Sequence, residues 1–332
     1  MVGNPGKLLP GIVVLVVGAI LARTLSGMVG FHELLVAIAI GVLAANMAGI
    51  PDTFRPGIGT HTVWLAAGIV LLGASLTLEA ILEIGPTLLL VLIAVVITTV
   101  ATGELVARRI GGLSARFGSM LAAGAGICGV SAVVAVGGAI SARDTQIAYA
   151  AGVILLVDAI SIVVFPLAGA LLNLPDIVFG IWVGISMLST GPVVAVGFAY
   201  SETAGQWATL TKLARNALIG GVALGYGVYY ARSTASGATS LRTLHSNVPA
   251  FIWGFFLLVV LASAGVFSTG EHATMEQAVH WLFLLAFVGL GAEIQFDELR
   301  SVGATPALVV IIAMLVASAL SLVLALLLFG VA

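Results

Sequence analysis

Long apolar segments separated by short polar connectors make up most of this chain. Each segment has about 18 to 25 residues, the length at which a helix crosses a bilayer. We therefore expect an all-α polytopic membrane protein whose single transmembrane domain covers residues 1–332. Eleven spans are predicted, at approximately Leu8–Leu25, Glu33–Ile50, Thr62–Ile81, Pro86–Val106, Phe117–Ile140, Ile147–Leu172, Ile177–Tyr200, Ala208–Tyr230, Val248–Phe267, Ala278–Ile294 and Pro306–Gly330. The longest polar connector, Ala231–Asn247, is predicted to be a linker.

Composition agrees with this class. Hydrophobic residues make up 61% of the chain and charged residues 8%, whereas a soluble domain has about 25% charged residues. The net charge of −2 gives no indication of nucleic-acid binding. The single cysteine, Cys128, excludes an intrachain disulfide and a cysteine zinc cluster. Neither a phosphate-binding loop nor an HExxH metal motif occurs, so we expect no primary pump. Because the histidines fall near span ends, we also expect no enzyme.

The cationic residues predict an orientation. Under the eleven-span count, Arg23 and Arg143 fall on one side, together with Glu79, Glu83, Asp144, Glu202, Glu271 and Glu276. Cytoplasmic connectors carry an excess of Lys and Arg, so the N-terminus is predicted to be cytoplasmic and the C-terminus outside. The cations on the side of the N-terminus are Lys7, Arg55, Arg108, Arg109, Arg116, Arg232, Arg242 and Arg300.

Two internal similarities suggest repeated membrane units. The segment from His61 to Gly85 resembles the segment from His280 to Gly303, and the two spans involved cross in opposite directions. Separately, VVAVGGAIS at Val133–Ser141 recurs as VVAVGFAYS at Val193–Ser201. Inverted repeats are typical of secondary transporters. We expect repeats at approximately 30–173 and 177–330, preceded by an extra helix at 8–25, although chance similarity remains the alternative.

The segment GICGVSAVVAVGG, from Gly126 to Gly138, carries the most informative chemistry. Glycines at this density favour an opened helix. Small polar residues at a helix break in mid-membrane are typical of a transport site, while a tight helix contact is the alternative. Pro192 predicts a second break in the seventh span. The candidate residues at the two breaks are Gly126, Cys128, Gly129, Ser131, Ser189 and Thr190.

Glu293 follows Gly289 and Gly291 in the tenth span. Those glycines predict an interruption there, and a carboxylate beside freed carbonyls could bind Na⁺ or carry a proton, with Gln295 adding an oxygen ligand. The alternative is an interfacial acid near a helix end. We predict that the fifth and tenth spans are both interrupted and meet at mid-membrane. Their polar residues, together with Ser189 and Thr190, are then expected to share one cavity.

Lys212 and Arg215 lie three residues apart and share a helix face, with Asn216 adjacent. This group would suit an anionic substrate or a partner carboxylate such as Glu293 or Asp158, and snorkelling to the interface is the alternative. Asp158 lies deep in its span, where a structural partner or a coupling role is expected.

The chain resembles the YeiH-type sulfate exporter family over nearly its full length. This resemblance implies a secondary carrier related to the bile-acid sodium symporter superfamily, in a prokaryotic inner membrane. It also implies a panel domain, a core domain and two crossing discontinuous helices at the fifth and tenth spans. The segments that carry it are LLPGI, PGIGTHTVWLAAGIVLLGASLTL, GAGICGVSAVVA, ATLTKLARNAL, NVPAFIWGFF and GLGAEIQFDELRSVG.

One departure from the family pattern concerns coupling. Family members often carry a His-acidic motif, similar to HEVAQVVAAG, before the TKL segment. This chain has STGPVVAVG at Ser189–Gly197 instead. Proton coupling or substrate choice is therefore expected to differ here.

The function we expect is secondary active transport of a small anion, sulfate or organosulfonate-like, coupled to Na⁺ or H⁺. The lipid bilayer is the other partner, no cofactor is expected apart from Na⁺ if that is the coupling ion, and a homodimer is left open. Alternatives are a cation/proton antiporter that uses Glu293 and Asp158, and a membrane receptor or structural protein. An intramembrane enzyme would need Cys128 beside a histidine, and the histidines fall near span ends.

Overall fold

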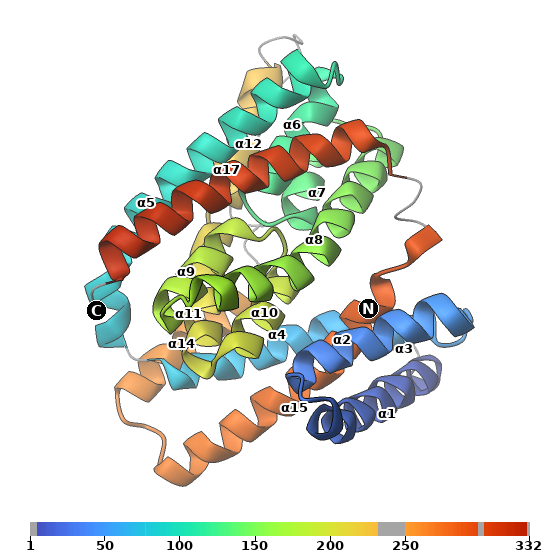
Figure 1. Ribbon diagram of the computed structural model, residues 1–332, viewed down its shortest axis with the longest axis vertical. Helices are drawn as coiled ribbons and strands as arrows, with labels where there is room; N and C mark the ends of the chain where they lie inside the picture. Colours follow the sequence, from blue (N-terminus) through green and yellow to red (C-terminus); the bar gives the residue numbers. More distant parts are fainter. Residues whose placement is uncertain (1–4, 77, 232–249, 298–301, 331–332) are drawn as a thin grey trace. The chain divides into compact units, whose positions relative to one another are not determined.

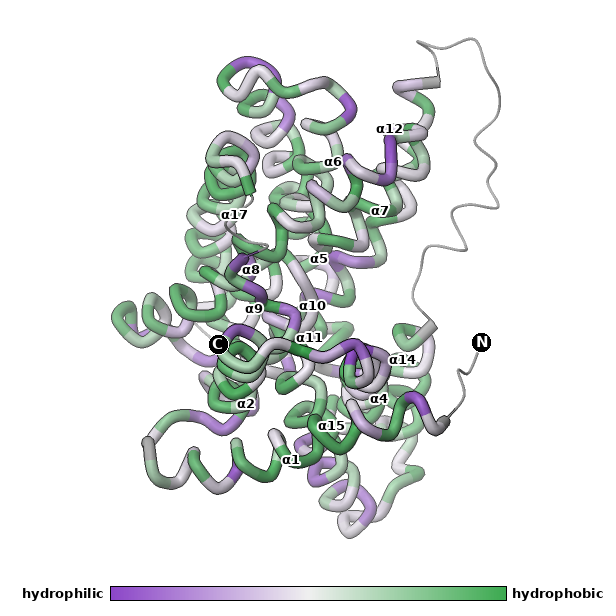
Figure 2. Tube along the Cα trace, turned by 90° about the vertical axis from the view of Figure 1, so that its right-hand side faces the viewer, coloured by the Kyte–Doolittle hydropathy of each residue, from purple (hydrophilic) through white to green (hydrophobic). Residues whose placement is uncertain are grey.

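The computed structural model describes residues 5–76, 78–231, 250–297 and 302–330, and within these ranges the chain is helical with no strand (Figure 1). This confirms the all-α polytopic class. Hydrophobic residues run along helices such as α17 and α8, and hydrophilic ones gather in connectors (Figure 2). The helices long and apolar enough to cross a membrane are Gly6–Met28, Arg55–Ser75, Ile84–Ile110, Asp144–Leu172, Thr269–Glu293 and Ala304–Phe329.

The chain forms two compact units, each built from two separate stretches of sequence. Unit 1 comprises Met1–Glu83 and Ala250–Asp297, and unit 2 comprises Ile84–Pro249 and Glu298–Ala332. The repeats expected at 30–173 and 177–330 follow a different division of the chain and stay a prediction. Nearly all of the predicted linker Ala231–Asn247 lies outside the described residues, as do Arg232, Arg242 and Arg300.

In unit 1, the long helix α15 packs against α2 and α4. Helix α1 packs against α2 and α3, and α14 packs against α4 and the turn η2 that follows it. The elements are α1 (Pro5–Val29), α2 (Glu33–Leu43), the π-helical turn η1 (Ala44–Ala48), α3 (Arg55–Ile58), α4 (His61–Leu72), the 3₁₀ turn η2 (Gly73–Ser75), α14 (Ala250–Ser263) and α15 (Thr269–Glu293).

The interruption predicted at Gly289–Gly291 is wrong, because α15 runs unbroken to Glu293. Both glycines allow close helix contacts instead. A Cβ at Gly289 would lie 2.2 Å from His61 Cβ, and one at Gly291 would lie 2.1 Å from the Ile38 carbonyl oxygen. Small residues let helix backbones approach closely in membranes. The glycines of this segment therefore pack α15 against α4 and α2 rather than open the helix.

Unit 2 is built around the 29-residue helix α8. Its elements are α5 (Leu78–Leu105, entering from the last residues of unit 1), the π-helical turn η3 (Val106–Ile110), α6 (Ala115–Gly126), α7 (Val130–Ala139), α8 (Asp144–Leu172), α9 (Asp176–Ser186), α10 (Thr190–Tyr200), α11 (Glu202–Asn216), α12 (Ile219–Ala231) and α17 (Ala304–Phe329).

The fifth predicted span is interrupted, as expected, between α6 and α7. It does not continue across the membrane, however, because α7 turns back beside α6. A Cβ at Gly137 would lie 3.2 Å from Met120 Sδ, and one at Gly124 would lie 2.9 Å from Val133 Cγ2. In a straight helix, residues 120 and 137 would be about 25 Å apart. The segment is a re-entrant hairpin, and Gly129, with φ of 64°, forms its turn.

The break predicted in the seventh span is also present, between α9 and α10, and this segment is a second re-entrant hairpin. The Tyr200 ring, at the end of α10, stacks on Phe179 in the first turn of α9 with ring centroids 3.8 Å apart. The Tyr200 hydroxyl donates to the Leu174 carbonyl at 2.7 Å. The chain therefore enters and leaves this hairpin at the same end of unit 2.

The two hairpins approach each other from opposite ends of α8 (Figure 1). Phe117 of α6 stacks on Tyr149 near the start of α8, whereas the Tyr200 hydroxyl lies near the Gly169 carbonyl at its end. The tips meet beside the middle of α8, where Asp158 Oδ1 accepts a hydrogen bond from the Ser189 amide at 3.1 Å. If α8 spans the bilayer, the meeting point lies near mid-depth.

The similarity between Val133–Ser141 and Val193–Ser201 has a structural counterpart. The first copy covers most of α7 and the second most of α10, so each forms the returning helix of one hairpin. The two copies run from the tips toward opposite ends of α8. This is the relationship expected of inverted units.

Helices α11 and α12 together cross unit 2. Helix α11 begins directly after the base of the second hairpin, and α12 packs against α7. The Tyr230 hydroxyl reaches to 3.0 Å from Ser119 Oγ, near the base of the first hairpin. The two helices are separated at Ala217–Leu218. The eighth predicted span is therefore a discontinuous crossing helix.

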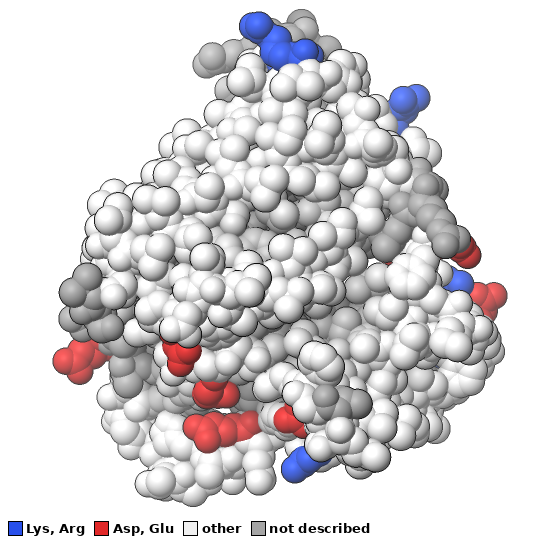
Figure 3. Space-filling model, in the orientation of Figure 1, with Lys and Arg blue, Asp and Glu red and all other residues white. Residues whose placement is uncertain are grey.

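The first hairpin changes the predicted side of Arg143 and Asp144. Because α7 returns to the end from which α6 starts, both lie at the same end of unit 2 as Arg108, Arg109 and Arg116, and the prediction that placed them opposite is wrong. Figure 3 shows basic side chains at the end of unit 2 where α5 and α6 meet, and an uncharged surface over α17 and α8.

Candidate functional site

Lys212 of α11 is fully buried and ties the two hairpin tips together. Its ammonium donates to the Ile127 carbonyl at 3.0 Å, to the Met187 carbonyl at 2.9 Å and to the Leu188 carbonyl. An ammonium has three protons to donate, so Lys212 has none left for a carboxylate or a substrate. The snorkelling alternative is wrong for this residue.

Arg215 makes a parallel set of contacts one turn further along α11. Its Nε donates to the Gly126 carbonyl at 2.9 Å, its Nη2 to the Ala125 carbonyl at 2.6 Å, and its Nη1 to the Met187 carbonyl at 2.8 Å. It is 1% exposed. The last carbonyls of a helix have no partner within the helix and carry its negative dipole end. Lys212 and Arg215 therefore neutralise the C-terminal ends of α6 and α9.

The N-terminal ends of α7 and α10 are left facing the meeting point of the tips. Neither helix is capped by the side chain of the residue that precedes it, because Gly129 has no side chain and Ser189 makes no such hydrogen bond. A Cβ at Gly129 would lie 2.3 Å from Ser189 Oγ, so the two tips touch. Helix N-termini present N–H groups and a positive dipole end, an arrangement that binds anions.

Unpaired polar atoms surround these two helix ends. Asn216 Nδ2 donates to Thr190 Oγ1 at 3.1 Å, which leaves Asn216 Oδ1 buried without a hydrogen bond. Asp158 Oδ2 and Ser189 Oγ are also buried and near each other, but no hydrogen bond of normal geometry joins them. A buried polar atom without a partner costs about 1–3 kcal/mol. Such atoms at a helix break indicate a ligand or water site.

The remaining predicted residues of unit 2 lie at the same place. The Cys128 thiol is buried, 4% exposed, and contacts the side chain of Ser131, which itself is exposed. Cys128 therefore packs the first tip, and Ser131 offers a hydroxyl on its outer side. The structure brings together at the tips Gly126, Cys128, Gly129, Ser131, Asp158, Ser189, Thr190, Lys212, Arg215 and Asn216.

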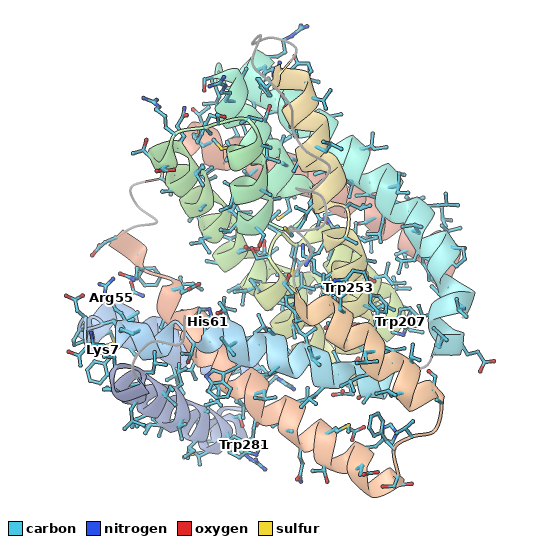
Figure 4. The ribbon with its side chains drawn as sticks, turned by 180° about the vertical axis from the view of Figure 1, so that it is seen from behind. Lys7, Arg55, His61, Trp207, Trp253 and Trp281 are labelled. Atoms are coloured by element: carbon cyan, nitrogen blue, oxygen red, sulfur yellow. The ribbon has the colours of Figure 1, made fainter. Side chains whose placement is uncertain are left out.

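Glu293 and Gln295 belong to unit 1, so the expected convergence of these two residues with the hairpin tips stays a prediction. Glu293 is the last residue of α15, as the helix-end alternative anticipated, and its side chain is 46% exposed. Its Oε1 lies 3.6 Å from Nε2 of buried His61. Figure 4 labels His61 at the start of α4. The described residues hold no group of three His, Cys, Asp or Glu side chains that could bind a metal, so Na⁺ near Glu293 stays a proposal.

Two residues beside Glu293, His61 and Asn46, were not predicted as site residues from the sequence. Nδ1 of His61 lies 3.1 Å from the Ile58 carbonyl, which fixes the ring toward Glu293. Asn46 holds the chain just after α15, because its Nδ2 donates to the Ile294 carbonyl and its Oδ1 accepts from the Phe296 amide, both at 2.7 Å. The sequence feature that could have identified Asn46 was its amide side chain inside the otherwise apolar second span.

Comparison with known proteins gives a family without a described activity. The profile of the family described as "Conserved hypothetical protein 698" matches residues 7–310. A UPF0324 membrane protein of Nitratidesulfovibrio vulgaris is 28% identical over 277 residues, 82% of this chain and 77% of the relative. One of Clostridium tetani is 27% identical over 313 residues, 90% of each chain.

A UPF0324 membrane protein of Bacillus cereus is 29% identical over 273 residues, which cover 82% of this chain and 79% of that protein. No solved structure matches the chain. These findings are consistent with the YeiH-type resemblance. The chain belongs to the family described as conserved hypothetical protein 698, whose relatives here are named UPF0324 membrane proteins.

Proposed function

We propose that this protein is a secondary active transporter of a small anion, which binds where the two hairpin tips meet. The observation that carries the proposal is the polarity of the four half-helices. Lys212 and Arg215 neutralise the carbonyl ends of α6 and α9. The positive ends of α7 and α10 face the tips, where Asp158 accepts from the Ser189 amide and the remaining N–H groups would meet a ligand. Ser131, Ser189 and Thr190 would supply hydroxyl donors to the anion.

The buried charges support an anion over a cation. In the described part of unit 2, the charged side chains that are fully buried are Lys212, Arg215 and Asp158, with a formal sum of +1. A monoanion such as an organosulfonate neutralises this sum alone, whereas sulfate does so together with one Na⁺ or proton. An antiporter site that binds only cations would add positive charge to a buried region that already has an excess, which is costly at low dielectric.

Coupling to Na⁺ or H⁺ has two candidate carboxylates. Asp158 lies at the tips with one oxygen unpaired, so it is suited to exchange a cation when the anion binds. Glu293 lies beside His61 in unit 1 and would couple through that pair. The variants Glu293→Gln and Asp158→Asn distinguish which of the two carries the ion.

The arginines of unit 2 indicate which end of this unit faces the cytoplasm. Arg108, Arg109, Arg116 and Arg143 all lie at the end where α8 starts. By the positive-inside rule this end is cytoplasmic. In this orientation the first hairpin enters from the cytoplasm and the second from outside. An anion bound at the tips would then be accessible to one side of the membrane at a time. The cytoplasmic N-terminus and the inner membrane of a prokaryote remain part of this proposal.

The test is flux into proteoliposomes. Purified protein is reconstituted, and uptake of labelled sulfate and of a small organosulfonate is followed under imposed Na⁺, H⁺ or no gradient. The proposal expects saturable uptake of at least one of these anions, accelerated by one of the two gradients. Exchange of Na⁺ for H⁺ without movement of any anion would instead establish the antiporter.

A further inference from the structure

A cavity of about 410 Å³ opens at the end of unit 2 that is remote from the hairpin tips. It lies between the end of α5, with its π-helical turn η3, and the end of α12. Glu104, Leu105, Arg108, Arg109, Tyr226 and Tyr229 line it. Single π-helical turns occur frequently at functional sites. None of the residues that carry the proposed transport function takes part in this cavity.

The Glu104 carboxylate in this cavity is already paired with the Arg108 guanidinium. Arg108 Nε lies 2.6 Å from Glu104 Oε2, and Ser119 Oγ donates to Glu104 Oε1 at 2.5 Å. The Arg108 guanidinium also lies over the Tyr229 ring, 5.9 Å from its centroid. Arg109 is exposed and forms no ion pair within the described ranges. The formal charge of the lining is therefore +1, contributed by a guanidinium that is free to bind an anion.

The surroundings of the cavity are those of a membrane–water interface. The apolar span Ile84–Ile110 ends here, and the arginines follow it directly. Tyrosine and arginine are the residues that anchor helices at this depth. Leu105 and Ile110, 59% and 71% exposed, present apolar surface next to the cavity, where acyl chains would lie.

We infer that this cavity binds the phosphate headgroup of an anionic phospholipid, with Arg109 as the principal ligand. A phosphodiester carries one negative charge, which matches the +1 of the lining. Guanidinium groups bind phosphate oxygens in a bidentate geometry. Basic pockets between helices at the cytoplasmic side are known lipid sites in membrane proteins. A free phosphate would leave the adjacent apolar surface uncovered, which favours the lipid as occupant.

The bound lipid would act on the helices that hold the hairpin tips. Tyr226 and Tyr229 lie on α12, which continues α11 with Lys212 and Arg215. Ser119 lies on α6, which ends at the first tip. A headgroup in the cavity would therefore contact α12 directly and α6 through the Glu104–Ser119 hydrogen bond. Helix α12 follows α11, and α6 ends at the first tip.

The test compares lipid binding by the wild type, by Arg109→Gln and by Arg116→Gln. Arg116 is also exposed at this end of unit 2 but does not line the cavity, so its variant controls for loss of surface charge. Purified protein in neutral detergent is titrated with phosphatidylglycerol or phosphatidylcholine, and bound lipid is counted by native mass spectrometry. This readout does not depend on transport.

We expect phosphatidylglycerol to bind wild type and Arg116→Gln alike, and Arg109→Gln about fivefold more weakly, which corresponds to about 1 kcal/mol for one arginine at a lipid surface. Arg109→Lys should recover part of the affinity. Equal binding by wild type and Arg109→Gln would overturn the inference. So would equal binding of phosphatidylcholine, or full displacement of the lipid by glycerol phosphate, which would indicate a site for free phosphate.

Discussion

Lys212 and Arg215 donate to the same carbonyl, that of Met187 at the end of α9, at 2.9 and 2.8 Å. Each also reaches the end of α6 in the other hairpin. Two side chains one turn apart on α11 thus hold both hairpins through carbonyl oxygens. The two tips are thereby fixed to α11 and to each other.

Lys212→Met should destabilise the protein by about 3 kcal/mol or more, because three buried carbonyls lose a charged donor. The apolar chain of methionine fills similar space, so the loss reports the hydrogen bonds. Thermal unfolding in detergent measures it, with Arg116→Gln as the exposed control. An unfolding temperature for Lys212→Met equal to that of the control would show that the tips do not depend on this residue.

Gly129→Ala should destabilise the first tip and abolish transport. The residue has φ of 64°, and an added Cβ would meet Ser189 Oγ at 2.3 Å, so both backbone strain and a clash oppose alanine. Gly138→Ala is the matched control, since Gly138 lies in α7 with open space where its Cβ would be. It should be neutral or stabilising by about 0.5–1 kcal/mol. Equal stability of the two variants would contradict the tip geometry.

Asn216→Asp should weaken anion binding by more than about a hundredfold. The change places a negative charge beside Thr190 and the N-terminus of α10. At an effective dielectric constant of about 20, a unit charge about 5 Å from a monoanion costs about 3 kcal/mol. The measurement is the anion concentration at half-maximal uptake. Asn173→Asp, the same change at an exposed helix end, should leave that concentration unchanged. A similar effect of both variants would mean that the anion does not bind at the tips.

Glu293→Gln should remove ion-coupled flux if Glu293 carries the coupling ion, and the protein should remain folded. Within unit 1 Glu293 contacts His61, and within unit 2 Lys212 donates to three carbonyls; a large loss of stability in Glu293→Gln would instead favour a salt-bridge role for Glu293. Asp158→Asn is the companion variant, since the amide oxygen can still accept from the Ser189 amide. Flux that remains gradient-driven in Glu293→Gln but not in Asp158→Asn would assign coupling to the tips.

The membrane class, the positions of the helices and the breaks at Gly129 and Ser189 could be predicted from sequence, because span length and glycine content are local properties. Sequence could not distinguish a broken crossing helix from a hairpin, since both have two short helices around a flexible turn. That choice depends on distant contacts such as Phe179 with Tyr200. The glycines of α15 were misread for the same reason, because only their neighbours His61 and Ile38 show that they pack.

The candidate site was predicted in part. The residues of both tips and the pair Lys212 and Arg215 were identified from their presence inside apolar spans. Their roles were not, because a buried cation can face a substrate, a carboxylate or a helix end. The six carbonyl contacts decide between these.

Uptake of labelled organosulfonate or sulfate by proteoliposomes that contain wild-type protein or Asn216→Asp tests the central claim most directly. The account predicts saturable, gradient-stimulated uptake by wild type, and uptake close to that of protein-free liposomes by Asn216→Asp at the same low anion concentration. Uptake by wild type no faster than by protein-free liposomes, for both anions and under both gradients, would contradict it.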